Sequence, residues 1–308
     1  MSPKQIKDVA ASVHQLLLNQ ARETKRPFNE LLQYYCMERF LYRLSKSSYV
    51  DKFVLKGALM LVAWKAPLSR PTMDIDFLGL LKNDLEGIGK VIQALCREKV
   101  TDDGIVFDPA SIKTSRINED ADYQGVRAKI RGRLGNARLA LQIDVGFGDT
   151  VVPKAAAVDY PTLLPFPAPQ LRGYTRESAV AEKFEAMTKL GLLNSRLKDF
   201  FDIWLLARRF DFDGATLTKA VRRTFENRAT KIDPKPIALT DSFSSDAAKQ
   251  TQWRSFLRRS RLEGAPAELN EVVDSNARFL LPVSEGLARG EDFKQTWHAP
   301  GPWSLSAR

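Results

Sequence analysis

The chain has 308 residues, of which 44% are hydrophobic, so it is long enough for two domains that each bury a core. Lys and Arg exceed Asp and Glu by 47 − 37 = 10, which favours a polyanionic partner such as nucleic acid. The two histidines and two cysteines argue against a zinc cluster and a Ser-His-Asp triad. No apolar run reaches the ~18 residues that cross a bilayer, and the N-terminus lacks a secretory leader, so we expect a cytoplasmic protein without membrane contact.

Residues 1–50 show apolar positions at helical spacing, with a break at Arg26-Pro27. The second predicted helix is rich in aromatic side chains, namely Tyr34, Tyr35, Phe40 and Tyr42. Such side chains beside arginines could stack on bases, but an aromatic stripe at helical spacing is more typical of a core. We therefore predict that this helix is packed inside the fold.

The stretch Lys56–Leu78 places two acidic residues on one face of a predicted strand. Side chains alternate along a strand, so Asp74 and Asp76 point one way while Met73, Ile75 and Phe77 point the other. Neighbouring carboxylates repel each other, and a divalent cation such as Mg²⁺ removes the repulsion. The alternative is the polar face of an amphipathic strand, since Asp-x-Asp alone is short and common.

Residues 84–99 predict a helix, residues 105–118 predict one or two strands, and residues 124–148 predict a β-hairpin. Gly135-Asn136 fits a two-residue turn, and this turn fixes the register of the hairpin. Leu134 then faces Ala137, and Arg127 faces Asp144. Every apolar residue of the two strands falls on one face.

The other face of the hairpin carries a row of basic side chains, which we call the basic comb: Arg127, Lys129, Arg131 and Arg133. The comb ends beside Asp144. If this hairpin lies next to the strand of Asp74 and Asp76, Asp144 supplies a third carboxylate and the comb is placed to bind phosphates. The alternative is a solvated sheet face with a cross-strand ion pair.

Residues 152–173 contain five prolines and predict an extended connector, after which a helix begins at Thr175 and ends at Gly191. Lys183 lies one turn from Val180 and Met187, so it belongs to the apolar side of that helix and needs a partner. Asp199 and Asp202 share a face of the next helix and are the candidates. A purely structural ion pair between two helices is the alternative.

Residues 214–227, 244–262 and 266–281 predict further helices that form a bundle. We predict a flexible tail over residues 286–308, where prolines and glycines interrupt any periodic pattern.

Four motifs occur in a fixed order: Lys56-Gly57-Ala58, then Arg70–Asp76, then Ala181-Glu182-Lys183, then Lys198–Asp202. In this order they resemble the motifs of the AbiEii/AbiGii-type toxin nucleotidyltransferases, within the polymerase-β-like nucleotidyltransferase superfamily. The resemblance covers residues 28–262. One departure is that the usual Gly-Gly or Gly-Ser is Gly57-Ala58, which removes a hydroxyl but keeps a small residue for close backbone approach.

The resemblance implies that Asp74 and Asp76 are catalytic and hold Mg²⁺, with Mn²⁺ as an alternative, against a nucleoside triphosphate (NTP). It implies that Lys183 neutralises phosphate charge and that Asp199 orients the site or assists the attacking hydroxyl. Asp144 as the third metal ligand rests on the superfamily together with the hairpin register. We expect the substrate to contact Lys56, Gly57, Ala58, Arg70, Thr72, Asp202, Arg127, Lys129 and Arg131.

We therefore expect an α+β protein. Residues 1–170 form a nucleotidyltransferase-like domain with N-terminal helices and a mixed sheet flanked by helices, residues 171–285 form a helical bundle, and residues 286–308 form the tail. The function implied is a Mg²⁺-dependent toxin nucleotidyltransferase that transfers a nucleoside monophosphate from an NTP to RNA. Its acceptor is expected to be the tRNA 3′ end, translation is blocked as a result, and an antitoxin is expected as partner.

Two other functions remain open from the sequence. The first is a nucleotidyltransferase of the same fold that modifies a small molecule such as an antibiotic, against which the basic comb and the net charge argue. The second is an RNA-binding module without catalysis, against which the complete set of carboxylates argues.

Overall fold

The computed structural model describes residues 8–66, 70–120, 123–262 and 264–305. Chain contacts divide the protein into two compact units. Unit 1 contains the chain up to Trp64, Pro71–Gly148 and Ala156–Gly173, and unit 2 contains Lys65–Arg70, Asp149–Ala155 and the chain from Tyr174 onward. The described part of the chain has no helix that is long and apolar enough to cross a membrane.

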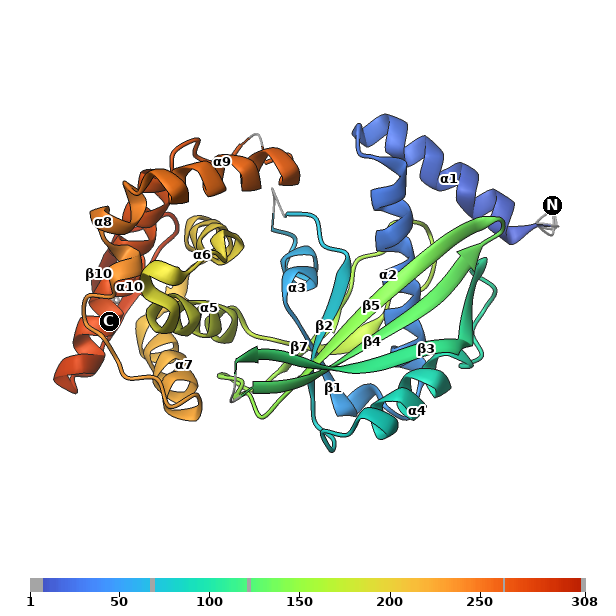
Figure 1. Ribbon diagram of the computed structural model, residues 1–308, viewed down its shortest axis with the longest axis horizontal. Helices are drawn as coiled ribbons and strands as arrows, with labels where there is room; N and C mark the ends of the chain where they lie inside the picture. The colour runs from blue at the N-terminus through green and yellow to red at the C-terminus, as the bar shows by residue number, and fades with distance from the viewer. Residues whose placement is uncertain (1–7, 67–69, 121–122, 263, 306–308) are drawn as a thin grey trace. The chain divides into compact units, whose positions relative to one another are not determined.

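Unit 1 is built on a seven-stranded sheet with the order β3-β4-β5-β2-β1-β7-β6 (Figure 1). Its strands are β1 (Phe53–Lys56), β2 (Asp74–Gly79), β3 (Ile105–Asp120), β4 (Tyr123–Leu134), β5 (Ala137–Phe147), β6 (Ala156–Asp159) and β7 (Gln170–Gly173). β2 pairs in parallel with β5, and β1 pairs in parallel with β7, while the other neighbours are antiparallel. The predicted mixed sheet is therefore confirmed.

The helices of unit 1 are α1 (Val9–Thr24), α2 (Phe28–Lys46), α3 (Ala58–Ala63) and α4 (Leu85–Cys96). α2 contacts β5, β7 and α4, while α4 contacts β3 and β4, so these two helices cover the apolar face of the sheet. Every residue of α2 from Leu31 to Leu44 is buried, and the aromatic stripe belongs to this core as predicted.

The hairpin of β4 and β5 has the predicted register: Leu134 pairs with Ala137, and Arg127 pairs with Asp144. Alternation places apolar side chains such as Ile130 and Ile143 in the core and the polar ones on the opposite face. In β2, Ile75 and Phe77 are buried as predicted. Met73 instead lies just before the strand and is 57% exposed.

Unit 2 is mainly helical, with α5 (Arg176–Leu190), α6 (Leu197–Arg209), α7 (Gly214–Asn227), α8 (Asp241–Ser244), α9 (Ala247–Ser260) and α10 (Leu269–Arg289) (Figure 1). The hydroxyl of Thr175 accepts a hydrogen bond from the backbone N–H of Ser178, and Gly191 ends the helix, so both predicted ends of α5 are confirmed. α5 packs on α6 and α7, and α6 packs on α10.

The C-terminal region differs from the predicted flexible tail. α10 continues through Pro282 to Arg289, and β9 (Gln295–Trp297) then pairs with both β8 (Phe212–Asp213) and β10 (Trp303–Leu305). The physical reason is aromatic packing: Trp297 is 3% exposed, and the Trp303 ring stacks on Phe279 with a centroid distance of 5.6 Å. The chain passes between the units several times, and the last crossing is at Gly173 and Tyr174. The predicted domain of residues 1–170 is therefore not continuous, because Lys65–Arg70 and Asp149–Ala155 belong to unit 2.

Candidate active site

Three carboxylates of unit 1 lie on one face of two neighbouring parallel strands. In the pairing of β2 with β5, Asp76 lies opposite Asp144 and Asp74 lies opposite Gln142. Cα partners on adjacent strands project to the same face, so this register brings together Asp74, Asp76 and Asp144. Lys56, at the end of β1, is the partner of Asp76 on the other side.

The turn between β1 and α3 approaches Asp76 so closely that only glycine fits. Gly57 has φ +71° and ψ −153°, a backbone conformation that is accessible essentially to glycine alone. A Cβ on Gly57 would lie 2.1 Å from Oδ2 of Asp76. Ala58 then begins α3 and is 3% exposed. At Gly57 the Asp76 carboxylate therefore has a backbone neighbour that carries no side chain.

Asp144 is joined to the basic comb by an ion pair with two contacts. Arg127 Nε lies 2.8 Å from Oδ1 of Asp144, and Arg127 Nη2 lies 2.7 Å from Oδ2. Gln142 Nε2 approaches the same Oδ2 at 3.4 Å. The hairpin register places Arg127 against Asp144 as predicted, and the cross-strand ion pair that was named as the alternative is formed, with one contact to each oxygen of Asp144.

The comb has an extension that sequence reasoning misses. Lys113 of β3 is the register partner of Lys129, and both side chains are exposed. Arg131 is exposed as well and contacts Asp108 loosely at 3.4 Å. Sequence reasoning missed Lys113 because the register of β3 shifts between Asp108 and Lys113, and this shift interrupts the simple alternation of side chains. Two adjacent strands, β3 and β4, therefore carry cations on this face.

Thr72 and Arg70 precede β2. The backbone N–H of Thr72 donates to the Tyr34 hydroxyl at 3.2 Å, and its own hydroxyl oxygen lies 3.4 Å from the backbone N of Asp74. Arg70 belongs to unit 2 and binds Asp202 through Nε and Nη2, at 3.0 and 3.1 Å.

Unit 2 assembles a buried charge network around Lys183. The Nζ of Lys183 lies 2.8 Å from Oδ1 of Asp199 and 2.8 Å from Oδ2 of Asp202. Asp199 also accepts a hydrogen bond from Nε of Arg196 at 2.9 Å. Both predicted partners of Lys183 are therefore present. Arg196 was missed, although its position three residues before Asp199 was a usable signal.

Charge pairing dominates this network. Burial acts to lower the pKa of Lys183, but the attraction of Asp199 and Asp202 outweighs burial and the pKa is raised. Burial acts to raise the pKa of Asp199, yet Lys183 and Arg196 lower it to about 2. At neutral pH the network is therefore fully ionised around Lys183 and Asp199.

The family model for the nucleotidyl transferase AbiEii toxin, of the type IV toxin-antitoxin systems, matches residues 39–275. The chain belongs to the AbiEii nucleotidyltransferase family. Its match spans both units and every motif named from the sequence. As a member of the AbiEii family, the protein is a nucleotidyltransferase.

Two solved structures resemble this AbiEii protein. JHP933 from Helicobacter pylori is 16% identical, with a TM-score of 0.50 over 85% of this chain and 96% of that one, which is a likeness of fold. A second H. pylori protein, assigned as a nucleotidyltransferase, is 17% identical, with a TM-score of 0.47 over 86% of this chain and 99% of that one. Among curated proteins, none matches the sequence.

AbiEii-family chemistry implies a divalent metal, and the residues of unit 1 meet this requirement in part. Asp74 and Asp76 offer carboxylate oxygens on one face, and Gly57 leaves Asp76 without a crowding side chain. Asp144 already pairs with Arg127 through both oxygens. Within the described residues, no group of three or more His, Cys, Asp or Glu side chains has the geometry to hold a metal ion. The carboxylates of Asp74 and Asp76 therefore suit a metal, and Asp144 as the third ligand stays a prediction, with its carboxylate paired to Arg127 in this structure.

Proposed function

We propose that this AbiEii-family protein transfers a nucleoside monophosphate from an NTP to RNA, with the 3′ end of tRNA as acceptor and Mg²⁺ as the metal. The main support for this proposal is the strand register, in which Asp74 and Asp76 lie beside Asp144 and the basic comb on one face of the sheet. Carboxylates suit a cation, and the adjacent row of cations suits the backbone of a nucleic acid.

In the proposed reaction, the 3′ hydroxyl oxygen of the RNA forms a bond to the α-phosphorus of the NTP. The bond from that phosphorus to the oxygen bridging to the β-phosphate breaks, pyrophosphate leaves, and the hydroxyl proton passes to water. Asp74 and Asp76 would hold Mg²⁺, which supplies charge neutralisation on the phosphate oxygens. Mn²⁺ would use the same ligands.

The chain's own groups have distinct parts in this proposal. Lys56, at the end of β1, and the backbone at Gly57-Ala58 face the triphosphate, and the missing Cβ of Gly57 leaves room for the Asp76 carboxylate beside them. Lys183 supplies positive charge to the phosphates. Asp199, with a pKa of about 2, is a poor proton acceptor, which supports a role in orienting Lys183 rather than in assisting the hydroxyl. Arg70, Thr72 and Asp202 are assigned to substrate contacts or their support.

The deciding experiment incubates the purified protein with each labelled NTP, Mg²⁺ and total RNA. Label on RNA supports the proposal, label only on small acceptors favours a small-molecule nucleotidyltransferase, and the absence of label favours a module without catalysis. Asp74→Ala and Asp76→Ala should abolish the label, since each removes half of the metal ligand pair. Oxidation of the RNA 3′ diol with periodate should also abolish it, and label on oxidised RNA would exclude the 3′ end as acceptor.

Membership of the AbiEii family extends the proposal to an effect on translation in the cell. A toxin that adds nucleotides to tRNA 3′ ends stops their aminoacylation, and this would block translation in the cytoplasm. An antitoxin partner is expected from the type IV toxin-antitoxin assignment. Addition of the enzyme and NTP to a translation extract should stop protein synthesis, and fresh tRNA added after the enzyme has been removed should restore it.

A further inference from the structure

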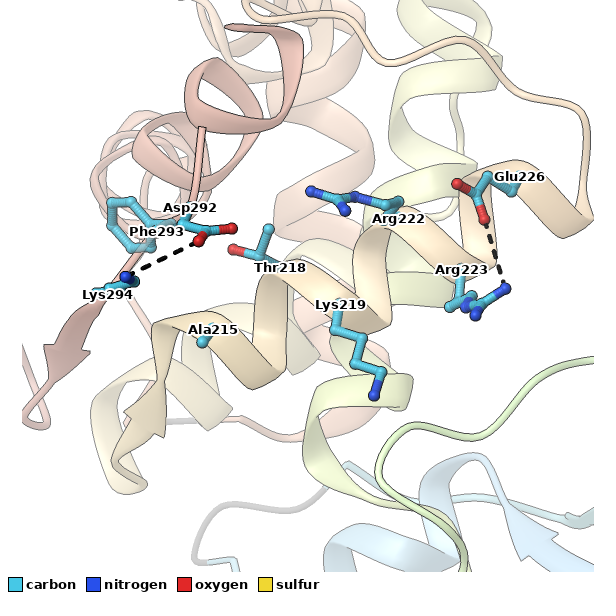
Figure 2. Close-up of a pocket in the computed structure, with 9 residues that line it drawn as sticks. All are labelled: Ala215, Thr218, Lys219, Arg222, Arg223, Glu226, Asp292, Phe293 and Lys294. Atoms are coloured by element: carbon cyan, nitrogen blue, oxygen red, sulfur yellow. Dashed lines mark ion pairs between the residues drawn. The ribbon is translucent and has the colours of Figure 1, made fainter. Parts of the chain in front are cut away.

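A solvent-open cavity of about 470 Å³ lies in unit 2, between α7 and the segment that follows α10 (Figure 2). Its lining includes the cations Lys219 and Arg222, the aromatic ring of Phe293, and the carboxylates of Glu226 and Asp292. None of these residues belongs to the motifs that define the candidate active site. The cavity therefore needs its own explanation.

The cations on α7 have few partners. Lys219, Arg222 and Arg223 are exposed and lie on one helix face because they are three and four residues apart. Arg223 contacts Glu226 only at 3.9 Å, whereas Lys219 and Arg222 have no ion-pair partner among the residues that the structure describes. Figure 2 shows Arg222 reaching from α7 toward the segment of Asp292 and Phe293. Such cations are available to an anion.

The aromatic ring at the cavity is held in place. A Cβ on Gly214 would lie 2.7 Å from Cδ1 of Phe293 and 2.4 Å from the carbonyl oxygen of Gln295, so glycine is required for α7 to pack this closely. On another side the Phe293 ring meets Trp303 edge to face, at a centroid distance of 4.9 Å. Phe293 is nevertheless only half-buried and lines the cavity. A fixed, partly exposed ring is suited to stacking on a base.

A further polar group faces the same cavity. Thr218 is 5% exposed, and its hydroxyl oxygen has no hydrogen-bond partner among the described residues. Buried polar groups are rarely left unpaired, and such an exception calls for an explanation.

We propose that this cavity is a second RNA subsite, which binds a single-stranded stretch of the acceptor. Lys219 and Arg222 contact phosphates, and Phe293 stacks on one base. The combination of unpaired cations with a fixed ring matches single-stranded nucleic acid, which offers a charged backbone and unstacked bases together. This inference rests on the proposed function, in which the acceptor is RNA.

The test measures binding of a fluorescent single-stranded RNA of about ten nucleotides by anisotropy across a salt series. Lys219→Glu/Arg222→Glu should weaken binding and reduce the salt slope by about 1.4, since each phosphate contact on a single strand contributes about 0.7. Phe293→Leu keeps an apolar side chain against Trp303 and should weaken binding about five-fold or more without changing the slope. The matched control is Arg258→Glu/Arg259→Glu, which reverses two exposed charges on α9.

NTP affinity and melting temperature should stay at wild-type values in the α7 double variant and in Phe293→Leu. RNA affinities equal to that of the control would overturn the subsite even if the wild-type enzyme labels RNA. A wild-type protein that neither binds nor labels RNA would overturn the subsite together with the proposed function. If the wild-type protein labels RNA and only these variants bind RNA more weakly, the result supports both the subsite and the proposed function.

Discussion

At the scale of single residues, Lys183 carries one charge between two buried carboxylates. Substitution by Met keeps the aliphatic packing and removes the charge. Leaving a buried charge wholly unpaired costs about 3–5 kcal/mol, but Asp202 keeps Arg70 and Asp199 keeps Arg196. We therefore expect Lys183→Met to lose only about 1.5–3 kcal/mol of unfolding free energy, the range for hydrogen bonds to charged groups, while nucleotide transfer is abolished.

Urea unfolding and the labelled-NTP assay measure these two effects separately. Lys231→Met, which removes an exposed lysine of unit 2 outside the four motifs, is the control and should leave both unchanged. A folded Lys183→Met protein with wild-type transfer would show that Lys183 serves structure alone.

Gly57 provides a second test at this scale. Gly57→Ala introduces a Cβ that would lie 2.1 Å from Asp76 Oδ2, in a backbone conformation that other residues avoid. The carboxylate must move, so we expect transfer to fall by at least the ~10²-fold that follows a 1 Å misplacement of catalytic groups. Gly290→Ala is the control, because Gly290 has the same φ of +71° but open space around it. If the two variants transfer nucleotides equally well, the function of Asp76 does not depend on Gly57.

At the scale of elements, α2 anchors the proline-rich connector between β6 and β7. Oε2 of Glu38 accepts a hydrogen bond from the backbone N–H of Leu163 at 2.7 Å, and Arg39 donates to the carbonyl of Pro167 at 3.0 Å. Burial raises the pKa of Glu38 to about 7, although Arg39 and the Leu163 N–H act to lower it. Below about pH 7 the folded protein therefore holds more of Glu38 in the neutral form than the unfolded chain does, although Nη2 of Arg39 lies 2.7 Å from Oε1 of Glu38.

The sign of the pH effect follows from linkage. Between the ordinary value of 4.5 and about 7, the folded state binds more protons at Glu38 than the unfolded state, so stability falls as pH rises. The shift corresponds to a loss of about 3 kcal/mol, which is complete once the pH has risen through the folded pKa of about 7. Urea unfolding between about pH 5 and about pH 8 should show this decline in the wild type and its absence in Glu38→Gln, whatever the absolute stability of the variant. The same decline in Glu38→Gln would assign it to another group.

The basic comb is a property of the paired strands β4 and β5. Lys129→Glu/Arg131→Glu reverses two exposed charges on the polar face and should weaken RNA binding, with a salt slope lower by about 1.4 on single-stranded RNA. NTP affinity should stay constant. Arg97→Glu/Lys99→Glu, which alters two exposed residues just after α4, is the matched control. Unchanged RNA affinity across the salt series would show that the comb is an ordinary solvated surface.

Local signals explain which parts of the fold were predictable. The β4–β5 register follows from a two-residue turn and strict alternation, and it places Arg127 opposite Asp144 without tertiary information. The pairing of β2 with β5 was stated only as a condition, because parallel neighbours distant in sequence carry no such signal. The ion pair between Arg127 and Asp144 depends on side-chain orientation, which the sequence does not give, and the role of Asp144 as metal ligand stays a prediction.

At the scale of the whole molecule, the C-terminal residues were the least predictable. Their tryptophans stand among glycines and prolines without periodicity, and their partners lie far away in sequence. Trp297 packs on Phe279 at a centroid distance of 4.9 Å, and its Nε1 donates to the carbonyl of Ala207 at 2.6 Å. The C-terminal segment, which follows all the helices of unit 2 in sequence, therefore completes the core of that unit.

Trp297→Ala tests this structural role. Removal of a buried tryptophan should lower the unfolding free energy by about 3–5 kcal/mol, because the cavity left behind adds to the lost burial. Leu305→Ala is the control, since Leu305 is 83% exposed and its truncation should stay within about 0.5 kcal/mol. Urea unfolding followed by far-ultraviolet circular dichroism measures both. Because Trp303 and Phe293 adjoin the RNA subsite proposed on α7, Trp297→Ala should also weaken binding of single-stranded RNA. A variant with wild-type stability would mean that the C-terminal segment is dispensable for unit 2, as expected of a flexible tail.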